Sequence, residues 1–320
     1  MNRLRRWYNQ NTKNIWILVG VVAIIIIGIQ LVNSFYKREN EELLNNTVEQ
    51  NTDINSSYNN ITIGDERSSL TGDKLSEGQK TEIGTIDQFI SYCNEQDIES
   101  AYNLLTDECK EEMYPELQNF QNSYYDEVFA GAKKNVSVEN WTSNIYKIEI
   151  NEDFLSTGVY SKENTMQDYI TVEKYEDEYK LNINGYIGRK EKNDEKEENN
   201  IKMTVKEVNS YMDYETYKIE ITNNSENTIL LDDGVDINAM YIEDTNDVKY
   251  SAYTHEINSA ELRVSPRETK TISIKYYSRY ISSKDINRLV FSRMVLDYDS
   301  YSQYTNKSAY TDYGEFRIEI

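Results

Sequence analysis

An uninterrupted apolar run near the N-terminus constrains this chain more than any other feature of its sequence. Residues 15–32 read IWILVGVVAIIIIGIQLV, and Gln30 is the only strongly polar side chain in the run. As a helix, these 18 residues would extend for about 27 Å, which is just enough to cross the hydrocarbon core of a bilayer. The run has no polar face, so it does not fit a helix at the surface of a soluble domain. With the aromatic residues that follow it, the run predicts a membrane-spanning helix over residues 15–36.

The charges around the run predict its orientation. Residues 1–38 contain six basic residues and no acidic one, with four before the run and two after it. The positive-inside rule therefore predicts that residues 1–14 lie in the cytoplasm and that the chain beyond residue 36 lies outside. Neither a small-residue cleavage site nor a cysteine follows the run closely, so we expect a permanent single-pass anchor in the cell membrane rather than a removed signal peptide.

The chain is strongly acidic, and the acidity lies beyond the predicted membrane segment. Its 320 residues carry a formal charge of −22, so the part after residue 38 carries −28. Because nucleic-acid binding depends on neutralising phosphates with Lys and Arg, we expect no nucleic-acid partner. The first part of this acidic region, residues 37–83, is rich in Asn, Ser, Thr and Glu and lacks a sustained apolar pattern. We expect it to be a flexible stalk.

The first sustained apolar pattern starts close to residue 84 and predicts helices followed by strands. Thr85 and Gln88 form a capping-box pattern, and apolar residues then recur at helical spacing up to Cys93. Pro115 and Gly131 fit the start and the end of a later helix, with the apolar stripe Leu117, Phe120, Tyr124 and Val128. The pattern then changes to period two, with strands expected over 136–138, 145–150, 154–160, 169–175 and 179–183. Helices followed by an antiparallel sheet predict an α+β domain over residues 84–188.

The helical part of this region resembles a known family. Residues 89–129, FISYCNEQDIESAYNLLTDECKEEMYPELQNFQNSYYDEVF, resemble the helical start of nuclear-transport-factor-2-like domains. The aromatic-rich run AYNLLTDECKEEMYP is similar to domains that are tethered outside Gram-positive membranes by one N-terminal helix. The resemblance implies a cone-shaped domain, in which a curved antiparallel sheet folds around the helices. The family contains enzymes such as ketosteroid isomerases beside many binding and structural modules, so the resemblance leaves activity open.

The second half of the ordered region predicts a domain built only of strands. Residues 188–200, GRKEKNDEKEENN, are so dense in charge that we expect a hydrated linker over 189–200. Nine short strand-like runs over 201–320 then predict a β-sandwich. The segment YKIEITNNSENTILL is similar to immunoglobulin-like domains of bacterial surface proteins. The Cys and Trp hallmarks of antibody domains are absent, so this resemblance implies the architecture alone.

Few residues in this chain carry recognisable chemistry. A single histidine, His255, excludes sites that need two, and no nucleotide-binding, hydrolase or metalloprotease motif occurs. We therefore expect no catalytic residue, no metal and no cofactor. The acidic runs Asp232–Asp236 and Asp297–Asp299 offer carboxylates to calcium, but they lack the EF-hand spacing and fit solvated turns better. Cys93 and Cys109, the only thiols, either pair as a disulfide outside the membrane or stay as two buried free thiols.

Two hypotheses for function follow. The first is a membrane-anchored, non-enzymatic interaction protein of the cell envelope that contacts another envelope protein or a wall polymer, for example in a secretion, conjugation or wall-associated assembly. The second is an enzyme or small-ligand carrier that uses the cavity of the cone-shaped domain. A deep pocket with a paired Asp and Tyr favours the second hypothesis, and a filled cone with an exposed aromatic patch favours the first. The sequence leaves the oligomeric state open.

Protease added outside intact cells should remove both predicted domains, because only residues 1–14 are expected on the cytoplasmic side. The measurement is an immunoblot for a tag at each end of the chain, on intact and on permeabilised cells. We expect intact cells to lose the C-terminal tag, and the N-terminal tag to survive until the cells are permeabilised. A C-terminal tag that resists protease on intact cells would contradict this orientation.

Overall fold

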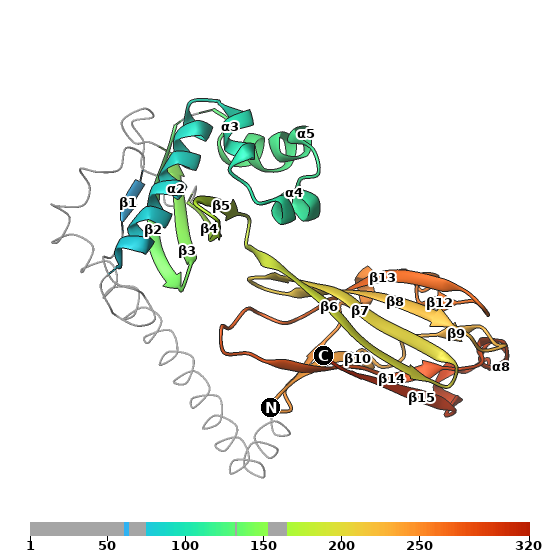
Figure 1. Ribbon diagram of the computed structural model, residues 1–320. Coiled ribbons are helices and arrows are strands. Elements are labelled where there is room, and N and C mark those ends of the chain that lie inside the picture. Colours follow the sequence, from blue (N-terminus) through green and yellow to red (C-terminus); the bar gives the residue numbers. More distant parts are fainter. Residues whose placement is uncertain (1–60, 64–74, 132, 153–164) are drawn as a thin grey trace, which may run out of the picture. The chain divides into compact units, whose positions relative to one another are not determined.

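A computed structural model describes residues 61–63, 75–131, 133–152 and 165–320 (Figure 1). The predicted membrane segment at 15–36 lies outside these residues. In the described part of the chain, no helix combines the length and the apolar character that crossing a bilayer requires. The contacts divide the chain into two units, Met1–Ser57 and Tyr58–Ile320, and all described residues belong to the second. The domain boundary expected near residue 188 stays a prediction.

The first described helix begins earlier than the sequence pattern predicted. Helix α2 (Glu77–Asn94) starts after Ser76, whose hydroxyl accepts a hydrogen bond from the Gln79 amide while the Gln79 side chain accepts one from the Ser76 amide. This capping box satisfies amides of the first turn that have no partner within the helix. The expected start at Thr85 is wrong, because Thr85 lies inside the helix and its hydroxyl donates to the Thr81 carbonyl (3.3 Å). The buried face is Ile83, Ile86, Phe89, Ile90 and Cys93.

Part of the predicted stalk belongs to the folded region. Strand β1 (Ile61–Ile63) pairs in parallel with β2 (Lys134–Thr142), and both of its isoleucines are buried. Leu75 is buried as well, directly before the start of α2. The stalk expected over 37–83 is therefore wrong for residues 61–63 and 75–83. A single alternation of three residues is too short to stand out within a polar sequence.

Short helices follow α2. They begin with α3 (Ile98–Asn103) and α4 (Asp107–Met113), and Thr106 caps α4 by accepting from the Cys109 amide (2.9 Å). The helix expected after Pro115 consists of α5 (Leu117–Phe120), the π-helical turn η1 (Gln121–Tyr125) and α6 (Asp126–Val128). A π-helical turn adds one residue to the helical repeat, and both Tyr124 and Tyr125 are buried there. Of the four residues in the expected apolar stripe, Phe120, Tyr124 and Val128 are buried, but Leu117 is 37% exposed.

A five-stranded sheet packs with these helices. Strands β2, β3 (Ile145–Glu152), β4 (Met166–Tyr175) and β5 (Glu178–Asn182) pair antiparallel in chain order, and β1 adds to β2. Helix α2 lies against β2 and β5. These strands correspond to those expected at 136–138, 145–150, 169–175 and 179–183, while the strand expected at 154–160 lies outside the described residues. Helices followed by an antiparallel sheet make this part of the chain α+β.

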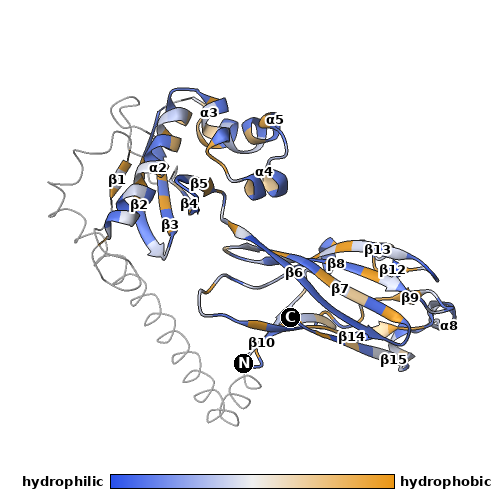
Figure 2. Cartoon of the chain, viewed as in Figure 1, coloured by the Kyte–Doolittle hydropathy of each residue, from blue (hydrophilic) through white to orange (hydrophobic). Residues whose placement is uncertain are grey.

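The segment expected to be a linker is a strand. Strand β6 (Tyr186–Glu198) pairs antiparallel with β7 (Ile201–Tyr211), and Asn199 and Asn200 form the turn with φ of 54° and 60°. Strand β6 lies at the edge of its sheet, and Figure 2 shows it hydrophilic along most of its length. Charged side chains suit an edge strand, because they discourage pairing with other chains. The hydrated linker over 189–200 is therefore wrong: its side chains are solvated, but its backbone is paired.

The remaining strands form two sheets that share one core. The four-stranded sheet has the order β13-β8-β7-β6, and the six-stranded sheet has the order β11-β10-β14-β9-β12, with β15 paired to β14. Buried side chains from both sheets, such as Val205, Ile219 and Phe291, belong to one hydrophobic cluster, so the sheets pack face to face (Figure 1). Each of the nine strands expected over 201–320 has a counterpart. The strands not yet given are β8 (Glu215–Asn223), β9 (Ile229–Leu230), β10 (Met240–Asp244), β11 (Lys249–Ser251), β12 (Arg263–Val264), β13 (Thr269–Tyr276), β14 (Ile286–Val295) and β15 (Tyr313–Glu319).

Limited proteolysis should leave the β6–β7 hairpin intact, because proteases cut exposed, unpaired segments and the β6 backbone is paired with β7. The experiment adds trypsin to the purified full chain in detergent and measures the mass of each fragment over time. We expect no early cut after Lys190, Lys192 or Lys196. Early cuts at these lysines that give two stable fragments would contradict the strand and support the predicted linker over 189–200.

Candidate functional site

The interior of the α+β part is packed with aromatic side chains. The ring of Phe89 lies 6.3–6.4 Å from those of Phe120, Tyr124 and Phe129, measured between centroids. Phe120 and Tyr124 stack on each other at 5.7 Å. None of these four side chains is more than 4% exposed. The enzyme or carrier hypothesis needs a ligand-sized space within this part, and these rings fill the region between α2 and the later helices by packing against one another.

A buried carboxyl group, that of Asp168, lies beside Tyr124 in this interior. The Tyr124 hydroxyl and the Asn184 amide donate to Asp168 Oδ2 (3.4 and 3.0 Å), and the Tyr169 amide donates to Oδ1 (2.6 Å). Burial raises the pKa of Asp168 from 3.8 to about 6, although these hydrogen bonds lower it. An Asp and a Tyr are thus paired, as a site in the cone requires, but they are only 6% and 1% exposed. In this arrangement the carboxylate holds the turn at Asn184.

The two cysteines of the candidate disulfide are both buried. The structure describes Cys93 on α2 and Cys109 on α4 as free thiols. Burial raises the pKa of each thiol, which keeps it protonated and slows its oxidation. The disulfide stays a prediction, and the mass of the full chain alkylated with and without prior reduction tests it.

A cluster of ionised side chains joins helix α4 to strands β6 and β7. Arg189 Nη1 lies 2.8 Å from Glu111 Oε2, and its Nη2 lies 3.7 Å from Glu112 Oε2. Glu112 also accepts from the Tyr211 hydroxyl (2.7 Å) and from Asn209 Nδ2 (3.2 Å). The Arg189 side chain is 13% exposed, so water screens these contacts less than it does at an open surface. The geometry identifies a structural clamp, because every charged group in it is used to hold α4 on the hairpin.

Four side chains form a partly exposed group that we call the tyrosine–lysine stack: Tyr214, Tyr253, Lys275 and Tyr277. The rings of Tyr253 and Tyr277 are stacked, with centroids 3.3 Å apart and an interplanar angle of 20°. Lys275 Nζ lies 4.4 Å from the Tyr253 ring centroid and 4.2 Å from that of Tyr214. Tyr277 is 49% exposed. The other three members are half-buried, and Lys275 Nζ also lies 3.5 Å from Glu256 Oε2. The stack therefore presents one exposed tyrosine on an ordered aromatic support.

Strand periodicity places the stack on the surface. In β13, Ile274 and Tyr276 are fully buried, so Lys275 and Tyr277 point to the opposite face. The Tyr253 amide donates to the Lys275 carbonyl (2.8 Å), and the Tyr277 amide donates to the Ser251 carbonyl (2.9 Å). These two bonds join the segment after β11 to the end of β13. They bring together rings that are more than twenty positions apart in the sequence.

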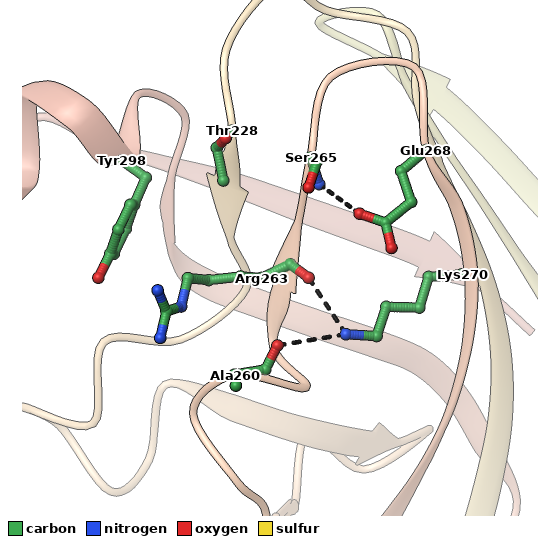
Figure 3. A pocket seen from close by; sticks show the side chains of 7 residues that line it. All are labelled: Thr228, Ala260, Arg263, Ser265, Glu268, Lys270 and Tyr298. Carbon is green, nitrogen blue, oxygen red and sulfur yellow. Dashed lines mark hydrogen bonds between the residues drawn. The ribbon is translucent and has the colours of Figure 1, made fainter.

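A depression of about 480 Å³ lies beside β12 (Figure 3). Two cations face it from different directions. The Arg263 guanidinium lies over the Tyr298 ring, 4.9 Å from its centroid, and Lys270 Nζ donates to the carbonyls of Ala260 and Arg263 (3.2 Å each). The Glu268 carboxylate accepts from the Ser265 amide (2.6 Å), which lowers the pKa of Glu268. The lining residues are Thr228, Ala260, Arg263, Ser265, Glu268, Lys270 and Tyr298.

The acidic runs that were considered for calcium form turns. Asp232, Asp233 and Asp236 each accept a hydrogen bond from the amide two residues further on. Asp297 caps α8 (Tyr298–Ser302) by accepting from the Ser300 amide (3.0 Å). Within the ranges that the structure describes, no three or more His, Cys, Asp or Glu side chains are placed to hold a metal ion.

His255 is 68% exposed and lies beside the stack, with its ring 6.0 Å from that of Tyr253.

Comparison with known proteins gave no relative. No protein-family model matches the chain, and neither a curated protein nor a solved structure matches it. The resemblances to nuclear-transport-factor-2-like and immunoglobulin-like domains therefore stay proposals. The function has to be argued from the surfaces of the molecule.

Sequence reasoning missed both the stack and the depression. It singled out no group among the 28 tyrosines. The alternation in SIKYY (273–277) contained a usable signal, because it predicts that Lys275 and Tyr277 share the exposed face. No comparable signal exists for the depression, whose residues come from three separate segments of the chain.

The contribution of Asp168 to the stability of the α+β part should fall as the pH rises from 4 to 7. The folded state holds the Asp168 proton more tightly than the unfolded chain does, because its pKa is raised from 3.8 to about 6. The stabilisation is complete below pH 4 and is lost as the pH rises through 6. Asp168→Asn stays neutral, so the unfolding free energy of the wild type minus that of this variant should fall by about 3 kcal/mol over this range.

Hydrogen exchange of the core amides of β4 and β5 measures this difference. Tyr124→Phe is the second variant: it removes a hydrogen bond that lowers the pKa of Asp168, so the fall should move to higher pH. A difference that does not change with pH, or that rises with it, would rule out a carboxyl group with a raised pKa at Asp168.

Proposed function

We propose that this chain is a membrane-anchored, extracytoplasmic interaction protein of the cell envelope. One helix over residues 15–36 anchors it in the bilayer, with residues 1–14 in the cytoplasm. A nuclear-transport-factor-2-like domain and an immunoglobulin-like sandwich then lie outside. The helix–sheet order of the α+β part and the two face-to-face sheets of the β part support this architecture.

The tyrosine–lysine stack is the observation that carries the proposal. Tyrosine is enriched at protein interfaces, because its ring buries a large area and its hydroxyl still forms a hydrogen bond. In the stack, the Tyr253 ring contacts both Lys275 and Tyr277, so it loses little freedom when a partner covers it. An exposed tyrosine on an aromatic support that is already ordered is suited to binding another envelope component.

The alternative function is an enzyme or small-ligand carrier that uses the interior of the α+β part. The paired Asp168 and Tyr124 are the observation in its favour, since such a pair supplies a base and a hydrogen-bond donor. The burial of both groups favours the interaction function, because a substrate would first have to displace the packed rings around Phe89.

Site-specific crosslinking in intact cells tests the proposal. A photoreactive benzoylphenylalanine replaces Tyr277 in the full chain, the cells are irradiated, and crosslinked products are identified by mass spectrometry. We expect one envelope component to be captured in a light-dependent manner. Adding Tyr253→Ala should reduce the captured amount about tenfold, because it removes the ring on which position 277 stacks.

The matched control carries the same photoreactive residue at Tyr175, which is 45% exposed and lies on β4, far from the stack in the sequence. Capture of the same component equally well from position 175 would indicate non-specific proximity. Recovery of the uncrosslinked chain alone from position 277 would overturn the proposal.

A further inference from the structure

Arg263 differs from the other arginines that the structure describes. Seven arginines lie in the described ranges, and Arg263 is the one among them without a carboxylate partner. In these ranges its guanidinium makes no hydrogen bond and no ion pair. It lies over the ring of Tyr298 in a cation–π contact. The six others pair as follows: Arg189 with Glu111, Arg267 with Glu226, Arg279 with Asp213, Arg288 with Glu243, Arg293 with Asp233, and Arg317 with Glu315.

The unpaired guanidinium is nevertheless held in place. The Tyr298 amide donates to the Thr228 carbonyl (2.9 Å), which fixes the tyrosine at the start of α8. The Tyr298 ring then supports the Arg263 side chain (4.9 Å), and Figure 3 shows the guanidinium beside this ring, away from Lys270 and Glu268. On the other side, Lys270 bonds to the Arg263 carbonyl (3.2 Å) and so fixes the backbone of β12. The five donors of the guanidinium are therefore ordered, and no described residue uses them.

The local charge is the reverse of the charge of the whole chain. The depression contains two cations, Arg263 and Lys270, and one anion, Glu268, which gives a local charge of +1 in a chain of −22. Glu268 accepts from the Ser265 amide and does not reach Arg263. Among the residues that the structure describes, no carboxylate pairs with this arginine, so its guanidinium is available to an anion from outside.

We propose that this depression binds a small ligand, of the size of a dipeptide, through one carboxylate group held by Arg263. A guanidinium matches a carboxylate with two parallel hydrogen bonds, which gives both strength and orientation. The volume of about 480 Å³ is adequate for such a ligand. The hydroxyls of Thr228 and Ser265 offer hydrogen bonds to its peptide groups, and Ala260 and the Tyr298 ring offer apolar contact.

The charge of the chain favours a single carboxylate over a polymer with many phosphates. A polyanion would bring further negative charges against a chain of −22, and that repulsion grows with each added group. One carboxylate gains the contact with Arg263 and adds only one charge. This site is separate from the tyrosine–lysine stack, so its test does not depend on the proposed partner of the stack.

Ligand-observed saturation-transfer NMR with the full chain in detergent tests this site. The probes are N-acetyl-alanyl-alanine with a free carboxylate, and the same dipeptide with a C-terminal amide. We expect saturable binding of the acid and binding of the amide about tenfold weaker, because the charge-assisted hydrogen bonds are lost. Arg263→Gln should weaken binding of the acid by about the same factor.

Arg267→Gln is the matched control, because it removes the same charge from the neighbouring turn but does not line the depression. It should leave the affinity for the acid unchanged. Equal binding of acid and amide, equal losses in the two variants, or no binding of the acid would each overturn the proposal. Inorganic phosphate that displaces the dipeptide as well as acetate does would overturn the choice of a carboxylate.

Discussion

The pairing of β6 with β7 is the constraint on which the rest of this structure depends. Strand β6 begins at Tyr186, shortly after β5 ends at Asn182, and forms the edge of the four-stranded sheet, so it leads the chain directly from the α+β part into the β part. Some of its charged side chains form ion pairs: Lys202 of β7 reaches Glu195 across the hairpin (2.8 Å), and Arg189 pairs with Glu111 of α4 (2.8 Å). Backbone pairing and ion pairs here replace the apolar side chains that a strand normally uses.

Both surfaces that we assign to binding lie where segments of the two sheets meet. The segment after β11, from the six-stranded sheet, bonds to the end of β13, from the four-stranded sheet, and this contact aligns Tyr253 with Tyr277. The depression likewise joins Arg263 of β12 to Lys270 of β13. The core fixes the backbone at both places, so the exposed side chains are ordered by the interior below them. Such rigid support is typical of binding surfaces on β-sandwiches.

The sequence predicted the elements with strong periodicity and missed those with weak or long-range signals. The buried face of α2 and the nine strands after residue 201 were visible in local patterns. The strand β6 was not, because its exposed charges resemble those of a linker. The pairing of Asp168 with Tyr124 was not visible either, since the two residues are 44 positions apart. Neighbours across sheets depend on register and packing, which no single-sequence pattern specifies.

The central claim is that the tyrosine–lysine stack is covered by another component in the cell envelope. Hydrogen exchange of the full chain, compared between native membranes and detergent-purified protein, tests it most directly. Our account predicts slower exchange in native membranes for peptides that contain Tyr253 and Tyr277, and unchanged exchange for peptides of β4 around Tyr175. Identical exchange of the stack peptides in the two preparations would contradict it.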